Sequence, residues 1–148
     1  MSIWMGEGFM SAFENAKKFF EACEAPKGWN GCKSYVADGA AFSSQAGALA
    51  NVKTVQAYCD WMKGLVDGPL PDGRYTLHSS AWDANTNTAS FVATFHGTHK
   101  GAGGPVPPTN KATNSHYVYA VKMNGEGKVA QMTKIWNDSY ALAELGWV

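Results

Sequence analysis

The sequence predicts a single α+β domain, with helices in its first half and an antiparallel sheet in its second half. Its 148 residues suit one domain. Apolar residues recur at steps of three and four before Gly68, which is the period of a helix, and at steps of two after Gly73, which is the period of a strand. Helices followed by hairpins favour a fold in which the helices cover one face of the sheet.

Two apolar stripes predict the two longer helices. The first consists of Phe9, Phe13, Ala16, Phe20 and Cys23, and the helix-ending run Pro26-Lys27-Gly28 follows it. The second consists of Val52, Val55, Cys59, Met62 and Val66, with Asn51 as N-cap and Gly68-Pro69 as its end. One or two helical turns are expected between these helices, at residues 29–36, before a turn at Asp38-Gly39.

Two hairpins are expected after the helices. Alternation predicts strands at residues 74–82 and 88–99, and again at residues 115–123 and 128–137. The loop between the hairpins, residues 101–111, is rich in glycine and proline. A last short helix is predicted at residues 139–145, ending at Gly146.

Composition and charge exclude several classes of function. Lys and Arg total 12, Asp and Glu total 12, and Arg74 is the only arginine, which disfavours nucleic acid and phosphate as partners. No apolar run approaches the ~20 residues of a membrane span, and no secretory signal is visible. Cys23, Cys32 and Cys59 match neither a disulfide framework nor a zinc motif, which indicates buried free thiols in a reducing cytoplasm.

Asp138 is the acid of the C-terminal half with the clearest catalytic potential. It follows the apolar run of residues 132–136, where partial burial would make its carboxylate a usable general base. On a regular strand it would share a face with Lys134 and Trp136, and Lys134 would then be its ion-pair partner. The spacing also allows Asp138 to be the N-cap of the last helix.

The histidines do not form a convincing metal site. His96 and His99 have odd spacing, so on a regular strand they would point to opposite faces and could not easily bind one metal ion. Alternation places His99 on the face of Phe91 and Phe95.

Two stretches of the C-terminal half resemble a known family. The runs Phe95-His96-Gly97-Thr98-His99-Lys100-Gly101 and Pro107-Pro108-Thr109-Asn110-Lys111 resemble the "G-T-H-x-G … P-P-T-G-K" stretch of SnoaL-like polyketide cyclases, in the nuclear transport factor 2-like superfamily. The end of the chain, Lys134-Ile135-Trp136-Asn137-Asp138 with Leu145-Gly146, resembles that family's closing segment. Because the segment after Asp138 is slightly shorter than the family pattern, Asn137 competes with Asp138 for the pocket-facing place.

The resemblance implies a cone-shaped fold for residues 1–148, with three N-terminal helices packed on a strongly curved antiparallel sheet that encloses one apolar pocket. It implies an acid on the last strand that removes a proton next to a carbonyl, a role that falls on Asp138. His99, Tyr117 or Tyr119 would be the donor to the developing oxyanion. The pocket is expected to be lined by Phe91, Phe95, His96, Tyr117, Tyr119, Trp136 and Asn137.

Three functions are open at this point. The first is an enzyme that cyclises, isomerises or dehydrates a hydrophobic carbonyl compound, with Asp138 and His99 as catalytic residues. The second is a non-catalytic binder of a small apolar ligand, and the third is a dimeric scaffold with a filled cavity. None of them requires a cofactor or a metal ion, and the homodimer is an expectation that comes from the family.

Overall fold

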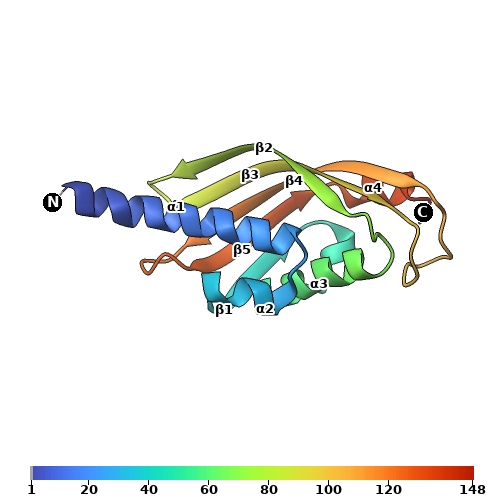
Figure 1. The fold of residues 1–148 in the computed structure, drawn as a ribbon, viewed down its shortest axis with the longest axis horizontal. Helices are drawn as coiled ribbons and strands as arrows, with labels where there is room; N and C mark the ends of the chain where they lie inside the picture. The colour runs from blue at the N-terminus through green and yellow to red at the C-terminus, as the bar shows by residue number, and fades with distance from the viewer. Residues whose placement is uncertain (1) are drawn as a thin grey trace.

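Four helices and a five-stranded sheet make up the computed structural model, which describes residues 2–148 and the side chains from Ala12 onward (Figure 1). The helices are α1 (Ser2–Glu24), α2 (Gly28–Cys32), α3 (Val55–Asp67) and the C-terminal α4 (Asp138–Glu144). The strands are β1 (Val36–Ser44), β2 (Arg74–Asp83), β3 (Thr88–Thr98), β4 (Ala112–Met123) and β5 (Val129–Trp136). Two 3-10 turns, η1 (Lys33–Tyr35) and η2 (Gly47–Leu49), flank β1. The predicted α+β class is confirmed.

The sheet is mixed and open, with strand order β1-β5-β4-β3-β2. The two predicted hairpins form its antiparallel part, whereas β1 pairs with β5 in parallel. The prediction of a wholly antiparallel sheet is therefore wrong at this edge. The predicted turn at Asp38-Gly39 is also wrong, because the register between β1 and β5 shifts between Val36 and Ala41 and Gly39 has a φ of +70° there. Gly39 supplies the left-handed backbone of a β-bulge inside a strand.

The two predicted apolar stripes are buried at most of their described positions, whereas Phe13, Val52 and Val66 are only partly buried. Ala16, Phe20 and Cys23 of α1 are buried, whereas Phe9 lies outside the residues whose side chains are described. Helix α3 buries Val55, Tyr58, Cys59 and Met62. Its N-cap is Thr54 and not Asn51 as predicted, because the hydroxyl of Thr54 accepts a hydrogen bond from the backbone N–H of Ala57. This is the geometry that a β-branched hydroxyl residue provides in extended backbone just before a helix.

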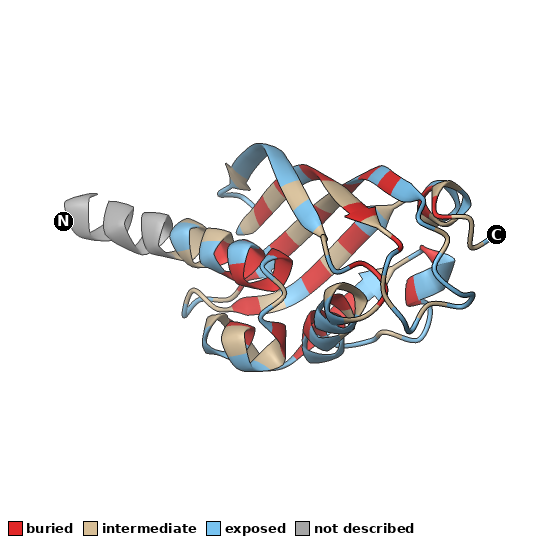
Figure 2. Ribbon diagram, turned by 45° about the vertical axis from the view of Figure 1, so that its right-hand side comes forward, coloured by how far each residue is buried: buried red, intermediate tan, exposed pale blue. Residues whose placement is uncertain are grey.

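The core lies between the sheet and the helices α1, α2 and α3. Phe20 stacks on Phe91 of β3 with ring centroids 4.7 Å apart and meets Tyr119 of β4 edge-on at 5.0 Å. Figure 2 shows buried residues alternating with others along the central strands, as period-2 burial of one face requires. In the part of the chain that the structure describes, no helix combines the length and apolar character needed to cross a membrane.

Strand β5 ends two residues before Asp138, and this changes the expected neighbourhood of that acid. Asn137 is the N-cap of α4, since its side-chain oxygen accepts from the backbone N–H of Tyr140, so the N-cap interpretation of Asp138 is wrong. Asp138 is the first residue of α4, and its Oδ2 accepts from the backbone N–H of Ala48 at 2.8 Å. The expected pairing of Asp138 with Lys134 is not formed, because the chain leaves the strand before reaching Asp138.

Candidate active site

A cavity of about 470 Å³ opens between the sheet, α3, α4 and the loop that follows β3. Its walls are largely apolar and include Trp61, Leu65, Phe95, Tyr117, Trp136 and Trp147. Two ionisable side chains, Glu24 and Lys134, also reach the wall. A mostly apolar pocket of this size with a few convergent polar groups is the usual form of a small-molecule site.

Glu24 is the last residue of α1 and is only 4% exposed. Its carboxylate accepts a hydrogen bond from the hydroxyl of Tyr117 and another from the hydroxyl of Tyr119, the latter at 2.5 Å. Both tyrosines lie on β4, so hydrogen bonds from the sheet fix the position of the Glu24 carboxylate. Burial raises the pKa of Glu24, while the charge of Lys134 and these two hydrogen bonds act in the opposite direction.

A chain of hydrogen bonds connects Lys134 with Glu24. Lys134 Nζ donates to the hydroxyl oxygen of Tyr58 at 2.9 Å, and the hydroxyls of Tyr58 and Tyr119 are 2.9 Å apart. Because Tyr119 uses its hydrogen toward Glu24, Tyr58 is the donor between the two tyrosines. The chain therefore runs in one direction, from the amine through two hydroxyls to the carboxylate, and it can carry a proton between its ends.

Lys134 itself lies in a box of aromatic rings. Its Nζ atom is 4.6 Å from the ring centroid of Trp136 and 5.1 to 5.4 Å from those of Tyr58, Tyr117 and Trp61. Burial lowers the pKa of Lys134 to about 8, and the Glu24 carboxylate limits the fall. At pH 7 about one Lys134 amine in ten is therefore neutral.

Sequence reasoning missed Glu24 and Lys134, although each left a signal in the pattern. Glu24 lies four residues after Phe20, so it continues the apolar stripe of α1 with an acid. Lys134 lies between Met132 and Trp136 in β5, among the alternate residues whose side chains belong to the inner face of the sheet. A charged residue on a buried face needs a partner, and two such residues of opposite sign in one small domain would have indicated a pair.

The predicted pocket-lining aromatic residues are divided between the cavity and the core. Phe95, Tyr117 and Trp136 line the cavity. Tyr119 lies behind them and holds Glu24, whereas Phe91 packs on Phe20 in the core.

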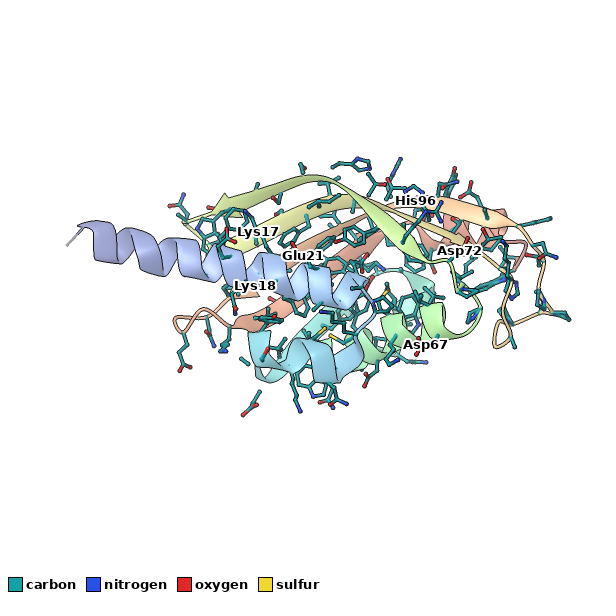
Figure 3. All side chains as sticks on the ribbon, viewed as in Figure 1. Lys17, Lys18, Glu21, Asp67, Asp72 and His96 are labelled. Atoms are coloured by element: carbon teal, nitrogen blue, oxygen red, sulfur yellow. The ribbon has the colours of Figure 1, made fainter. Side chains whose placement is uncertain are left out.

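The two predicted histidines lie apart from each other and from the cavity wall. His96 (labelled in Figure 3) has the outward parity of β3, where its ring nitrogens meet Thr76 and Asn114. His99 is fully buried on the inward parity, and its Nδ1 accepts from Trp147 Nε1 at 2.8 Å. The hydrogen of the neutral His99 ring is therefore on Nε2, and this atom has no hydrogen-bond partner among the described residues.

Asp138 and Asn137 lie at a second depression, beside β1 and β5. This depression has a volume of about 430 Å³ and shares Lys134 and Trp136 with the main cavity. Its walls include Ser43, Ser44, Gln45, Asn137 and Asp138, so they are more polar. The catalytic role of Asp138 and the role of His99 as oxyanion donor stay predictions.

Three thiols from three helices meet in the core. The sulfur atoms of Cys23 (α1), Cys32 (α2) and Cys59 (α3) all lie within 4.8 Å of one another. Among the described side chains of His, Cys, Asp and Glu, this is the group with the spacing of metal ligands. All three are buried and free, as the sequence predicted.

Solved structures place this architecture among known proteins. A proposed SnoaL-like polyketide cyclase from Jannaschia superposes with a TM-score of 0.73 over 92% of each chain, at 14% identity. IdmH, a proposed polyketide cyclase from Streptomyces antibioticus, has a TM-score of 0.72 at 15% identity, over 91% of this chain and 98% of that one. The fold is that of the SnoaL-like polyketide cyclases.

The SnoaL-like fold extends to other proteins as well. A protein from Catenulispora acidiphila with a ketosteroid isomerase-like fold, solved in complex with trimethylamine, has a TM-score of 0.63 at 14% identity, over 86% of this chain and 92% of that one. No protein-family model matches the sequence, and no curated protein matches it. At these identities the likeness concerns the fold alone.

Proposed function

We propose that the protein is an enzyme that removes a proton next to the carbonyl of a small hydrophobic compound bound in the 470 Å³ cavity. Glu24 is the general base, and the observation that carries this role is its buried carboxylate on the cavity wall, held by Tyr117 and Tyr119. The aromatic walls exclude water and bind the apolar part of the substrate. The resulting rearrangement is a cyclisation, isomerisation or dehydration, the reactions implied by the SnoaL-like resemblance.

The physical requirements of such a reaction agree with Glu24 better than with Asp138. A base needs a site near the bound substrate and a proton affinity close to the working pH. Glu24 meets the first condition because it lines the cavity, and burial shifts its pKa upward from the usual value of a carboxyl group. Asp138 is not among the residues that line this cavity; it lies beside the second depression, where its Oδ2 accepts from the backbone N–H of Ala48.

The volume of the cavity favours a ligand site over the filled scaffold. Small-molecule pockets have volumes of about 300–1,000 Å³, and this cavity falls within that range. The free thiols of the cysteine cluster fit a reducing compartment, which is why we place the protein in the cytoplasm.

A homodimer is part of the same proposal. A row of three paired residues crosses β3, β4 and β5 on the outer face of the sheet, namely Val92, Val118 and Ile135. Ile135 is 62% exposed and Val92 is 38% exposed, so this row presents apolar surface on the face of the sheet away from α1. A second copy of the chain would cover it.

Hydrogen–deuterium exchange of a ketone tests the reaction. We would follow the α-hydrogens of 2-tetralone in D₂O by proton NMR, with the wild-type protein and with Glu24→Gln. The wild type is expected to exchange them faster than buffer does, and Glu24→Gln is expected to lose at least about 100-fold of that rate. Glu21→Gln is the matched control, because Glu21 is exposed on the same helix (Figure 3).

The same assay compares the two candidate bases. If Asp138→Asn loses exchange and Glu24→Gln keeps it, Asp138 is the base and our assignment of Glu24 is wrong. Binding of 2-tetralone without any exchange would identify a non-catalytic binder instead. Circular dichroism and thermal unfolding of each variant establish that a lost rate does not reflect a lost fold.

A further inference from the structure

Lys134 is more deeply buried than an ordinary lysine and has fewer hydrogen-bond partners than its charge requires. It is 5% exposed and lines the cavity. An ammonium group has three N–H donors, but among the described side chains only the hydroxyl of Tyr58 accepts one of them. The other two hydrogens meet aromatic faces.

We propose that Lys134 is a nucleophile that forms a covalent iminium (a protonated Schiff base) with an aldehyde or ketone bound in the cavity. An iminium nitrogen retains a single N–H, and the site offers a single acceptor, Tyr58. The bond to carbon replaces the two N–H donors that lack an acceptor. The positive charge stays within the ring of Trp136, Tyr58, Tyr117 and Trp61, which stabilises a cation whether it is an ammonium or an iminium.

The hydrogen-bond chain to Glu24 accounts for every proton in this step. A proton moves from the Lys134 ammonium through Tyr58 and Tyr119 to the Glu24 carboxylate, leaving a neutral amine and a neutral acid. The amine then attacks the carbonyl carbon and Glu24 returns its proton to the carbonyl oxygen. The nitrogen passes a second proton to that oxygen, which leaves as water while the C=N bond forms. The sum is Lys134–NH₃⁺ plus R₂C=O giving Lys134–NH⁺=CR₂ plus H₂O, with no oxidant and no external acid.

Burial of the amine, and not the charged groups around it, favours this chemistry at neutral pH. Glu24 and Cys23 face Lys134 from α1, Tyr58 faces it from α3, and Tyr117 from β4. Burial outweighs the effect of these neighbours and lowers the pKa of Lys134 to about 8 from its usual 10.5. At pH 7 the neutral amine is then about 300-fold more abundant than in an exposed lysine.

This inference rests on the proposed function in one respect, namely that a carbonyl compound enters the cavity. The iminium also makes that function easier, because it acidifies the neighbouring C–H bonds that Glu24 deprotonates. Lys134 thus acts as a catalytic residue of the same site.

Reductive trapping tests the proposal. The wild-type protein is incubated with 2-tetralone and sodium cyanoborohydride at pH 7, digested and analysed by mass spectrometry. The reduced adduct is expected on Lys134 at least about tenfold above any other lysine, with a yield that rises through pH 8 and is absent from Lys134→Met. Lys122→Met is the matched control, because Lys122 is an exposed lysine of the neighbouring strand.

Comparison with the exchange assay separates the two proposals. If 2-tetralone is trapped on Lys134 but its α-hydrogens do not exchange, the iminium stands and the proposed proton abstraction fails. If Lys134→Met exchanges those hydrogens at the wild-type rate, or if the adduct spreads evenly over the surface lysines, the iminium proposal is overturned. Lys134→Arg keeps the charge and the fold but has no nucleophilic amine, so trapping on a folded Lys134→Arg protein would also overturn it.

Discussion

The amine of Lys134 on β5 and the hydroxyl of Tyr58 on α3 are 2.9 Å apart. The hydroxyl of Tyr58 also bonds to that of Tyr119, so a single oxygen atom connects the amine to the rest of the polar network. The ring of Tyr58 stacks on Phe42 with centroids 4.6 Å apart, which fixes the position of the hydroxyl.

Tyr58→Phe is expected to keep the stack on Phe42 and to destabilise the protein by about 1–3 kcal/mol, since Lys134 and Tyr119 lose a buried partner. Urea unfolding at pH 7 measures the loss. Tyr140→Phe is the control, because Tyr140 is 52% exposed. Removal of its hydroxyl group should change the free energy of unfolding by less than about 0.5 kcal/mol. Equal losses in the two variants would contradict the importance of the buried hydroxyl.

The stability of the protein should depend on pH through Lys134. The folded pKa of about 8 lies below the unfolded value of 10.5, so between these values the unfolded chain binds more protons than the folded chain. Stability therefore rises with pH across this window. From about pH 8 to about pH 9.5, the free energy of unfolding of the wild type should rise by about 1–2 kcal/mol relative to Lys134→Met.

Thermal and urea unfolding of both proteins across this range check the rise. Lys122→Met should follow the wild type, because Lys122 is exposed. A wild-type curve parallel to that of Lys134→Met would show that the amine titrates alike in the folded and unfolded chains.

Gly104 should tolerate no side chain. A Cβ atom there would lie 2.8 Å from Nε2 of the buried His99 and 3.3 Å from the ring of Trp147. Gly104→Ala is therefore expected to cost about 1–3 kcal/mol by overpacking, measured by urea unfolding. Gly125→Ala is the control, because a Cβ atom at Gly125 meets nothing within 4 Å. If both variants are as stable as the wild type, the loop does not pack on His99 as described.

The apolar row on the outer face of the sheet predicts the oligomeric state. Ile135→Glu would place a charge in the most exposed residue of the row that forms the proposed dimer interface. We expect the dimer to weaken at least about tenfold, measured by sedimentation velocity. Val148→Glu alters an apolar residue that is 82% exposed elsewhere, and it should leave the dimer unchanged. A wild-type protein that sediments as a monomer would contradict the prediction.

The sequence was sufficient to predict most of the helices and strands, because their signals are local. The stripe on α3 and the alternation in β2 to β5 are properties of neighbouring residues. Strand β1 was not predicted, because the sequence Asp38-Gly39 is typical of a turn. The strand is defined by its pairing with β5, which is far away in the sequence. The cap of α4 shifted by one residue for a similar reason, since both Asn137 and Asp138 have the chemistry of an N-cap.

The site was harder to predict because its polar groups come from distant segments. The family resemblance together with strand parity assigned Phe95, Tyr117 and Trp136 to the pocket, but parity did not separate them from Phe91 and Tyr119, which do not line the cavity. The pairing of Glu24 with Tyr117 and Tyr119 depends on how α1 crosses β4, which no spacing within either element specifies. The family resemblance drew attention to the C-terminal acid, whereas the buried acid lies at the end of the first helix.

The hydrogen-bond chain also bears on how the protein folds. Its links join residues that are 95, 76 and 61 positions apart, namely Glu24 with Tyr119, Lys134 with Tyr58 and Tyr58 with Tyr119. Contacts of such long sequence separation form late, because large loops must close before they are made. A nascent chain therefore has no reactive amine until β5 has joined the sheet, and a half-folded molecule does not expose an activated lysine to the aldehydes of its surroundings.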